Sequence, residues 1–177
     1  MSDDTRTRIR TCVEAHPGLH FNGLSRQLDV ATGQLQYHLR HLVDHDTLVR
    51  ETYYGQTHYY PPDTDPSHRG ILALVRRETS RDILFDLLEH GPARPTDVVD
   101  RLDIARSTLQ WHLDRLVEQD VVRKRTDPDN GLTLVVDRRD ETLQLLETIE
   151  PSFSERMVDR FERLFDSLVA EQTDDTC

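Results

Sequence analysis

The sequence predicts a mainly α-helical protein in which one small module occurs twice and a further helical segment follows. Three observations support this fold class. Residues 28–51 align without a gap on residues 102–125, and ten of the 24 aligned positions are identical. Apolar residues recur at helical spacing in both copies. Each copy ends in two short β-prone runs that flank a turn. We therefore expect two tandem domains with small β-hairpins, over residues 1–60 and 76–139.

Each copy begins with a helix whose apolar stripe includes Ile9 and Val13 in the first copy and Ile83 and Leu87 in the second. These stripes end at the sequences His-Pro-Gly and His-Gly-Pro, which cannot continue a helix. A short second helix is expected next in each copy. In the second copy it runs from Thr96, which follows a proline and is the expected N-cap.

A longer helix follows after a turn of only three or four residues. It is expected over residues 32–45 in the first copy and 106–119 in the second. Two helices joined by so short a turn form a helix-turn-helix motif. Residues 47–60 and 121–136 then each give a strand, a turn and a second strand, so that a β-hairpin, or wing, completes each copy.

The sequence LQYHLRHLVDHDTLVRETYYGQTHYY, residues 35–60, resembles the recognition helix and wing of ArsR- and MarR-like winged helix-turn-helix regulators. The resemblance covers residues 5–60 and 79–137. Tandem copies with Lys124 as the single lysine among 22 basic residues resemble a haloarchaeal transcriptional regulator. This resemblance implies a cytoplasmic, nucleoid-associated protein that binds double-stranded DNA and regulates transcription as a homodimer. An architectural protein that coats DNA and a winged-helix scaffold that binds only protein are the alternatives.

Duplex recognition needs polar side chains on the outer face of the longer helix and cations on the wing. With the leucines of that helix facing inward, the expected DNA-binding residues of the first copy are Thr32, Gln34, Gln36, Tyr37, Arg40 and Arg50. Those of the second copy are Arg106, Ser107, Thr108, Gln110, Trp111, Arg123, Lys124 and Arg125. The first-copy segment from Tyr53 to His58 is also expected to reach DNA. The sequence does not say which copy contributes more.

Two segments lie outside the repeat. Residues 61–75 begin with prolines and aspartates and are expected to be a linker. Residues 140–177 carry a net charge of -8 and an apolar stripe at helical spacing. Either the chain's own modules or a second copy of the chain would cover this stripe. We expect dimerisation, through Met157, Phe161, Leu164, Phe165 and Leu168.

Other functions lack the residues they need. The chain has no Gly-rich phosphate loop, no Gly-x-Ser-x-Gly and no His-Glu-x-x-His, so no enzymatic activity and no cofactor are expected. His41 and His45 have a spacing that can share a metal, but no cysteine lies nearby and a metal site is not expected. No apolar run is long enough to cross a membrane. No small-molecule ligand can be identified from the sequence.

Overall fold

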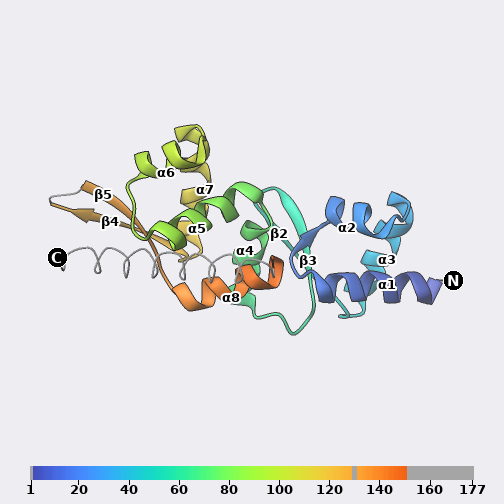
Figure 1. The fold of residues 1–177 in the computed structure, drawn as a ribbon. Helices are drawn as coiled ribbons and strands as arrows, with labels where there is room; N and C mark the ends of the chain where they lie inside the picture. Colours follow the sequence, from blue (N-terminus) through green and yellow to red (C-terminus); the bar gives the residue numbers. More distant parts are fainter. Residues whose placement is uncertain (1, 129–130, 151–177) are drawn as a thin grey trace, which may run out of the picture.

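The computed structural model describes residues 2–128 and 131–150 (Figure 1). In this part of the chain the two modules lie at opposite ends of an elongated arrangement, and two further helices lie between them. The described part is mainly helical with small antiparallel sheets, which confirms the predicted fold class. The expected dimerisation residues between 157 and 168 lie outside the described residues.

The first module contains α1 (Ser2–Ala15), β1 (Leu19–His20), α2 (Phe21–Leu28), α3 (Thr32–Asp44), β2 (Val49–Tyr53) and β3 (Gln56–Tyr60). Leucines of α2 and α3 meet Ile9 and Val13 of α1 in a buried core. The helix α1 stops before Pro17, and Gly18 takes a positive φ of 80° that lets its N–H donate to the Tyr59 carbonyl. This bond brings β1 beside β3, and the sheet order is β1-β3-β2.

The second module repeats this order with α5 (Glu78–His90), α6 (Pro95–Leu102), α7 (Arg106–Glu118), β4 (Val122–Asp127) and β5 (Gly131–Val136). The backbone repeats as well, because Asp29 and Asp103 both end the second helix in the left-handed region. A single bridge between Ala93 and Leu134 takes the place of β1. The expected N-cap Thr96 is wrong. The helix starts at Pro95, because a proline at the first helical position gives up no hydrogen bond, and Arg94 is the N-cap.

The expected linker contains a buried helix. Within residues 61–75, α4 (Pro66–Val75) begins where the Asp65 carboxylate accepts a hydrogen bond from the Ser67 N–H at 2.9 Å. Its last six residues, from Gly70 to Val75, are all buried. Ile71, Leu72, Leu74 and Val75 belong to the core of the second module, which also takes in Tyr60 at the end of the first wing. Residues 61–65 are therefore the only part of this segment that acts as a connection in the described structure.

The last described helix, α8 (Arg139–Ile149), lies next to α4 (Figure 1). Its Leu145 and Leu146 are buried in the same core as α4 and α5. The Glu141 carboxylate of α8 also lies 2.6 Å from the Nε2 atom of His68 on α4. The two helices outside the repeat thus extend the core of the second module.

Candidate nucleic-acid interface

The expected recognition face of the first module is open to solvent. Its five α3 residues, namely Thr32, Gln34, Gln36, Tyr37 and Arg40, are all exposed. Tyr37 is 62% exposed and is one of the two large apolar side chains most open to solvent among the described residues. Leu35, Leu39 and Leu42 are buried on the opposite side of the helix. The helical period thus separates a core face from a polar outer face, as expected.

A groove runs between α3 and the first wing, with a volume of about 390 Å³. Gln36 and Arg40 line it from the helix, and Arg50, Thr52 and Thr57 line it from the sheet. Thr52 and Thr57 face each other across β2 and β3. Thr57 belongs to the segment from Tyr53 to His58 that the sequence predicts to reach DNA. Sequence reasoning missed Thr52, although the alternation of sides along β2 places it on the same face as Arg50.

The groove carries positive charge. Among the described residues, no carboxylate forms an ion pair with Arg40 or Arg50. Both side chains are exposed. In a chain with a net charge of -11, two uncompensated guanidinium groups beside one groove form a local site for an anion.

The second module presents a more neutral face. Arg106, Ser107 and Gln110 are exposed and Thr108 is half-buried. However, the carboxylate of Asp114, which stands where α3 has Arg40, accepts hydrogen bonds from Gln110 and from Lys124, the latter at 3.1 Å. On the wing, Arg123 pairs with Asp137 at 3.1 Å, whereas Arg125 is exposed and has no ion pair with another described residue. The carboxylates thus offset much of the positive charge of this face.

Trp111 is not free on the surface of α7. Its ring is half-buried, and the guanidinium carbon of Arg115 lies 3.4 Å from the ring centroid. Arg77 lies over the same ring at 5.2 Å. Tyr54, from the tip of the first wing, contacts the ring edge-on at a centroid distance of 6.5 Å. Tyr37, at the corresponding position of the first module, is instead exposed, and no arginine of the described residues lies over its ring.

The tip of the first wing packs on the second module through Tyr53 and Tyr54, whereas Thr57 of the same segment lines the groove beside α3. The expectation that residues 53–58 reach DNA stays a prediction. The Tyr54 hydroxyl accepts a hydrogen bond from Gln119 at 3.0 Å, and its carbonyl accepts one from Arg77 at 3.1 Å. Tyr53 packs against the core of the second module, and His58 is only 1% exposed. The modules meet at this wing because its tyrosines are large enough to reach the second core.

The histidines of the recognition helices have structural positions. His38 is buried, and its counterpart His112 shares a 2.8 Å hydrogen bond with Ser80. The rings of His41 and His45 stack with centroids 4.0 Å apart. Within residues 2–128 and 131–150, no three His, Cys, Asp or Glu side chains are placed to hold a metal ion.

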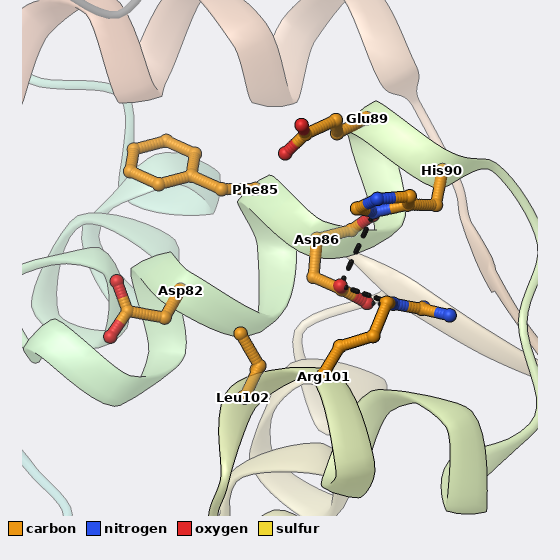
Figure 2. A pocket seen from close by; sticks show the side chains of 7 residues that line it. All are labelled: Asp82, Phe85, Asp86, Glu89, His90, Arg101 and Leu102. Atoms are coloured by element: carbon orange, nitrogen blue, oxygen red, sulfur yellow. Dashed lines mark hydrogen bonds and ion pairs between the residues drawn. The ribbon is translucent and has the colours of Figure 1, made fainter.

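A crevice between α5 and α6 is repeated in the first module. Figure 2 shows its seven lining residues, with Asp86 pointing toward Arg101 and His90. The corresponding crevice between α1 and α2 is lined by the residues 74 positions earlier, together with Thr7. Cys12 and Gln27 occupy there the positions of Asp86 and Arg101, and the Cys12 thiol contacts the Gln27 amide oxygen at 3.4 Å. Partial burial raises the pKa of the Cys12 thiol.

Two family models match the chain in succession. Residues 3–72 match a family described as an N-terminal HTH domain, and residues 65–125 match one described as a helix-turn-helix domain. The chain contains two helix-turn-helix domains. The two matched ranges overlap in the first part of α4, the helix that also joins the modules in space.

The helix-turn-helix domains have a relative among curated proteins. An uncharacterized HTH-type transcriptional regulator from Methanocaldococcus jannaschii is 27% identical over 125 residues, which cover 71% of this chain and 32% of the relative. The chain therefore aligns with about a third of the length of this relative. No described helix is long and apolar enough to span a membrane.

Solved structures similar to this chain include reduced AbfR bound to DNA, at 15% identity and a TM-score of 0.40, covering 58% of this chain and 80% of that chain. The transcriptional regulator Tm0710 from Thermotoga maritima is 20% identical with a TM-score of 0.38, covering 60% of this chain and 81% of that chain.

Proposed function

We propose that the protein is a DNA-binding transcriptional regulator that reads duplex DNA with the outer face of α3 and the adjoining side of the first wing. One observation carries this proposal: Arg40 and Arg50 stand without ion pairs in the described structure, on either side of a groove beside an exposed polar helix. A helix of this kind fits the major groove of B-DNA, and uncompensated guanidinium groups bind phosphates.

The residues of the first module divide into two roles. Gln36 reads base edges, because a glutamine side chain can form two hydrogen bonds with adenine. Arg50, at the edge of the wing, contacts a backbone phosphate and fixes the register without reading the sequence. Arg40 lines the same groove and can contact either a base edge or a phosphate.

The second module contributes less to the reading of bases. Its expected contacts are Arg106, Ser107 and Thr108 at the start of α7, and Arg125 on the wing. Asp114 engages both Gln110 and Lys124 and places a negative charge on the same face. A carboxylate near DNA phosphates weakens binding, so this module positions the protein more than it specifies the site.

The remaining expectations belong to the same proposal. The protein acts as a homodimer in the cytoplasm of a halophilic archaeon and associates with the nucleoid. Its apolar stripe between residues 157 and 168 joins two copies, so that two half-sites are bound together. The two winged helix-turn-helix units are residues 1–60 and 76–139, with α4 and α8 extending the core of the second, and dimerisation is placed in the segment that follows α8. The protein is not an enzyme and needs no cofactor.

Footprinting on genomic DNA recovered with the protein tests this proposal. A discrete protected site is expected. Uniform protection would indicate an architectural coat, and no protection would indicate a protein-binding scaffold. The variant pair Arg40→Ala and Arg50→Ala should weaken protection, whereas Arg10→Ala should not. Arg10 is a matched control because it is an exposed arginine on α1 that pairs with Glu14.

A further inference from the structure

The contact between the modules creates a cluster of two arginines and two aromatic rings. We call Tyr54, Arg77, Trp111 and Arg115 the junction patch. Arg115 lies over both rings, at 3.4 Å from the Trp111 centroid and 5.3 Å from the Tyr54 centroid. Arg77 lies over the Trp111 ring as well. Aromatic faces hold guanidinium groups in fixed positions but do not neutralise their charge.

The charge of the junction patch is not compensated by an ion pair. Among the described residues, neither Arg77 nor Arg115 has a carboxylate within ion-pair distance. Partial burial lowers the pKa of Arg77, and the positive charge of Arg115 nearby lowers it further. Glu118 lies near enough to influence Tyr54 but forms no ion pair with either arginine. The patch therefore has a net positive charge.

Within the described part of the chain, most N–H donors of Arg77 and Arg115 make no hydrogen bond to a protein atom. A guanidinium group offers five N–H donors. Arg77 donates to the Tyr54 carbonyl and Arg115 to the Trp111 carbonyl, and their Nε atoms are buried without a partner in the described part of the chain. Arg101, by contrast, places two donors on one carboxylate. Unused donors beside an uncompensated charge are what a bound oxyanion would satisfy.

The junction patch continues the recognition face of the second module. Trp111 comes one helical turn after Ser107 and one turn before Arg115, so the three side chains share a side of α7. The position equivalent to Trp111 on α3 is the exposed Tyr37. A duplex that reaches the start of α7 therefore has its backbone near the patch.

The local backbone indicates that Tyr54 is present for this contact and not for the turn. Tyr54 and Gly55 form a two-residue hairpin turn, and both have a positive φ, of 51° and 79°. Such turns favour Asn-Gly or Asp-Gly, and a tyrosine there carries a steric cost. The contacts with Gln119, Arg77 and Trp111 offset this cost. The wing tip thereby fixes the floor of the patch.

We propose that the junction patch binds a phosphate of the DNA backbone, through Arg77 and Arg115, between the two recognition helices. This inference rests on the proposed function, because it names a further contact with the same partner. It makes the junction of the modules part of the DNA-binding surface and assigns a role to two arginines that no motif of the helix-turn-helix selects.

The salt dependence of DNA binding tests the site. In full-length protein, Arg77→Gln and Arg115→Gln should each lower affinity about equally for all duplexes and reduce the slope of log K against log salt by ~0.9. Arg77→Lys and Arg115→Lys should restore the slope. Gln119→Ala removes a neutral hydrogen bond from the same junction and should leave the slope unchanged, as should Arg10→Gln on α1.

The fluorescence of Trp111 supplies a second readout, because it is the only tryptophan in the chain. Duplex DNA should change its emission, whereas inorganic phosphate at the same ionic strength as a chloride control should change it much less. Unchanged salt slopes in both glutamine variants, while the wild type still binds DNA, would overturn the junction site alone. A wild type that binds no DNA would overturn the proposed function. A phosphate response without a DNA response would assign the site to a small anion instead.

Discussion

Arg101 donates two hydrogen bonds of 2.6 Å to the carboxylate of Asp86, one to each oxygen. The Asp86 side chain is only 3% exposed, and this pair lines the crevice between α5 and α6 (Figure 2). His90 reaches the same carboxylate at 3.3 Å. In the first module, the uncharged side chains of Cys12 and Gln27 contact each other at the equivalent positions of the crevice. The same helix contact is thus made by an ion pair in one module and by neutral groups in the other.

Breaking the ion pair from one side should destabilise the second module. Arg101→Ala leaves the buried Asp86 carboxylate without its main partner, at a cost of about 3 kcal/mol. Importing the neutral pair with Asp86→Cys and Arg101→Gln together should stay within about 1 kcal/mol of wild type, because no unpaired charge remains. Urea unfolding at neutral pH measures both. Equal losses in the single and double variants would contradict this account.

The two recognition helices should differ in their sensitivity to loss of a glutamine. Gln36 lines the open groove, and Gln36→Ala should relax base preference by roughly 1–3 kcal/mol. Gln110 donates its amide hydrogen to Asp114, so Gln110→Ala should change preference less. A binding profile over a randomised duplex library compares the two variants. A larger effect at Gln110 would reverse the proposed order of the modules.

Removal of the Asp114 charge should strengthen DNA binding. Asp114→Asn frees Lys124 from its 3.1 Å ion pair and takes a negative charge from the recognition face. Affinity should rise for all duplexes, and the salt slope should steepen by about 1 as Lys124 becomes available to phosphate. Asp140→Asn, at the exposed start of α8, is the charge-matched control and should have little effect. Equal gains in both variants would indicate only a general charge effect.

Folding stability should fall in acid because of His58. Burial lowers the pKa of His58 below its ordinary value of 6.5. The hydrogen bond with the Gly18 carbonyl opposes this in part, and the charges of His20, Arg77 and Arg76 lower the pKa further. Above pH 6.5 the residue is neutral in the folded and the unfolded chain. Below it the unfolded chain binds a proton that the folded chain excludes, so stability declines as pH falls.

Chemical denaturation between pH 7 and pH 5 measures this decline. His58→Gln cannot take up the proton and should flatten the dependence on pH. Parallel pH profiles for wild type and His58→Gln would exclude His58 as the cause.

The C-terminal segment should control assembly. A chain that ends at Glu150 lacks the stripe of Phe161, Leu164 and Leu168 and should be monomeric, with weaker operator binding. Each of these side chains contributes roughly 1.5–3 kcal/mol when fully buried. The net charge of -8 over residues 140–177 opposes pairing, so the full-length dimer should loosen at low salt. Sedimentation at molar salt measures the oligomeric state of the full-length and the truncated protein. If the truncated protein is still a dimer, the dimer interface lies outside the C-terminal segment.

The repeat made most of the fold predictable. The alignment at an offset of 74 residues predicted both helix-turn-helix motifs to within a residue at α3 and α7, because helical spacing of leucines is a local property. The sequence prediction misses α4 because the prolines and aspartates of residues 61–66 indicate a linker, although an aspartate followed by proline also begins helices. The environment of Trp111 could not be predicted, because Tyr54 reaches it through tertiary structure from 57 residues earlier in the chain.

The position of Tyr60 makes the two halves mechanically dependent. Its ring is fully buried in the core of the second module, and its hydroxyl donates to the Arg69 carbonyl on α4, yet it is the last residue of the first module's own sheet. Two repeated domains joined by a linker can usually rotate relative to each other. Here a rotation of the second module would have to move β3 of the first module with it, because Tyr60 belongs to both. The spacing of the two DNA-binding modules along a duplex is therefore set within a single chain.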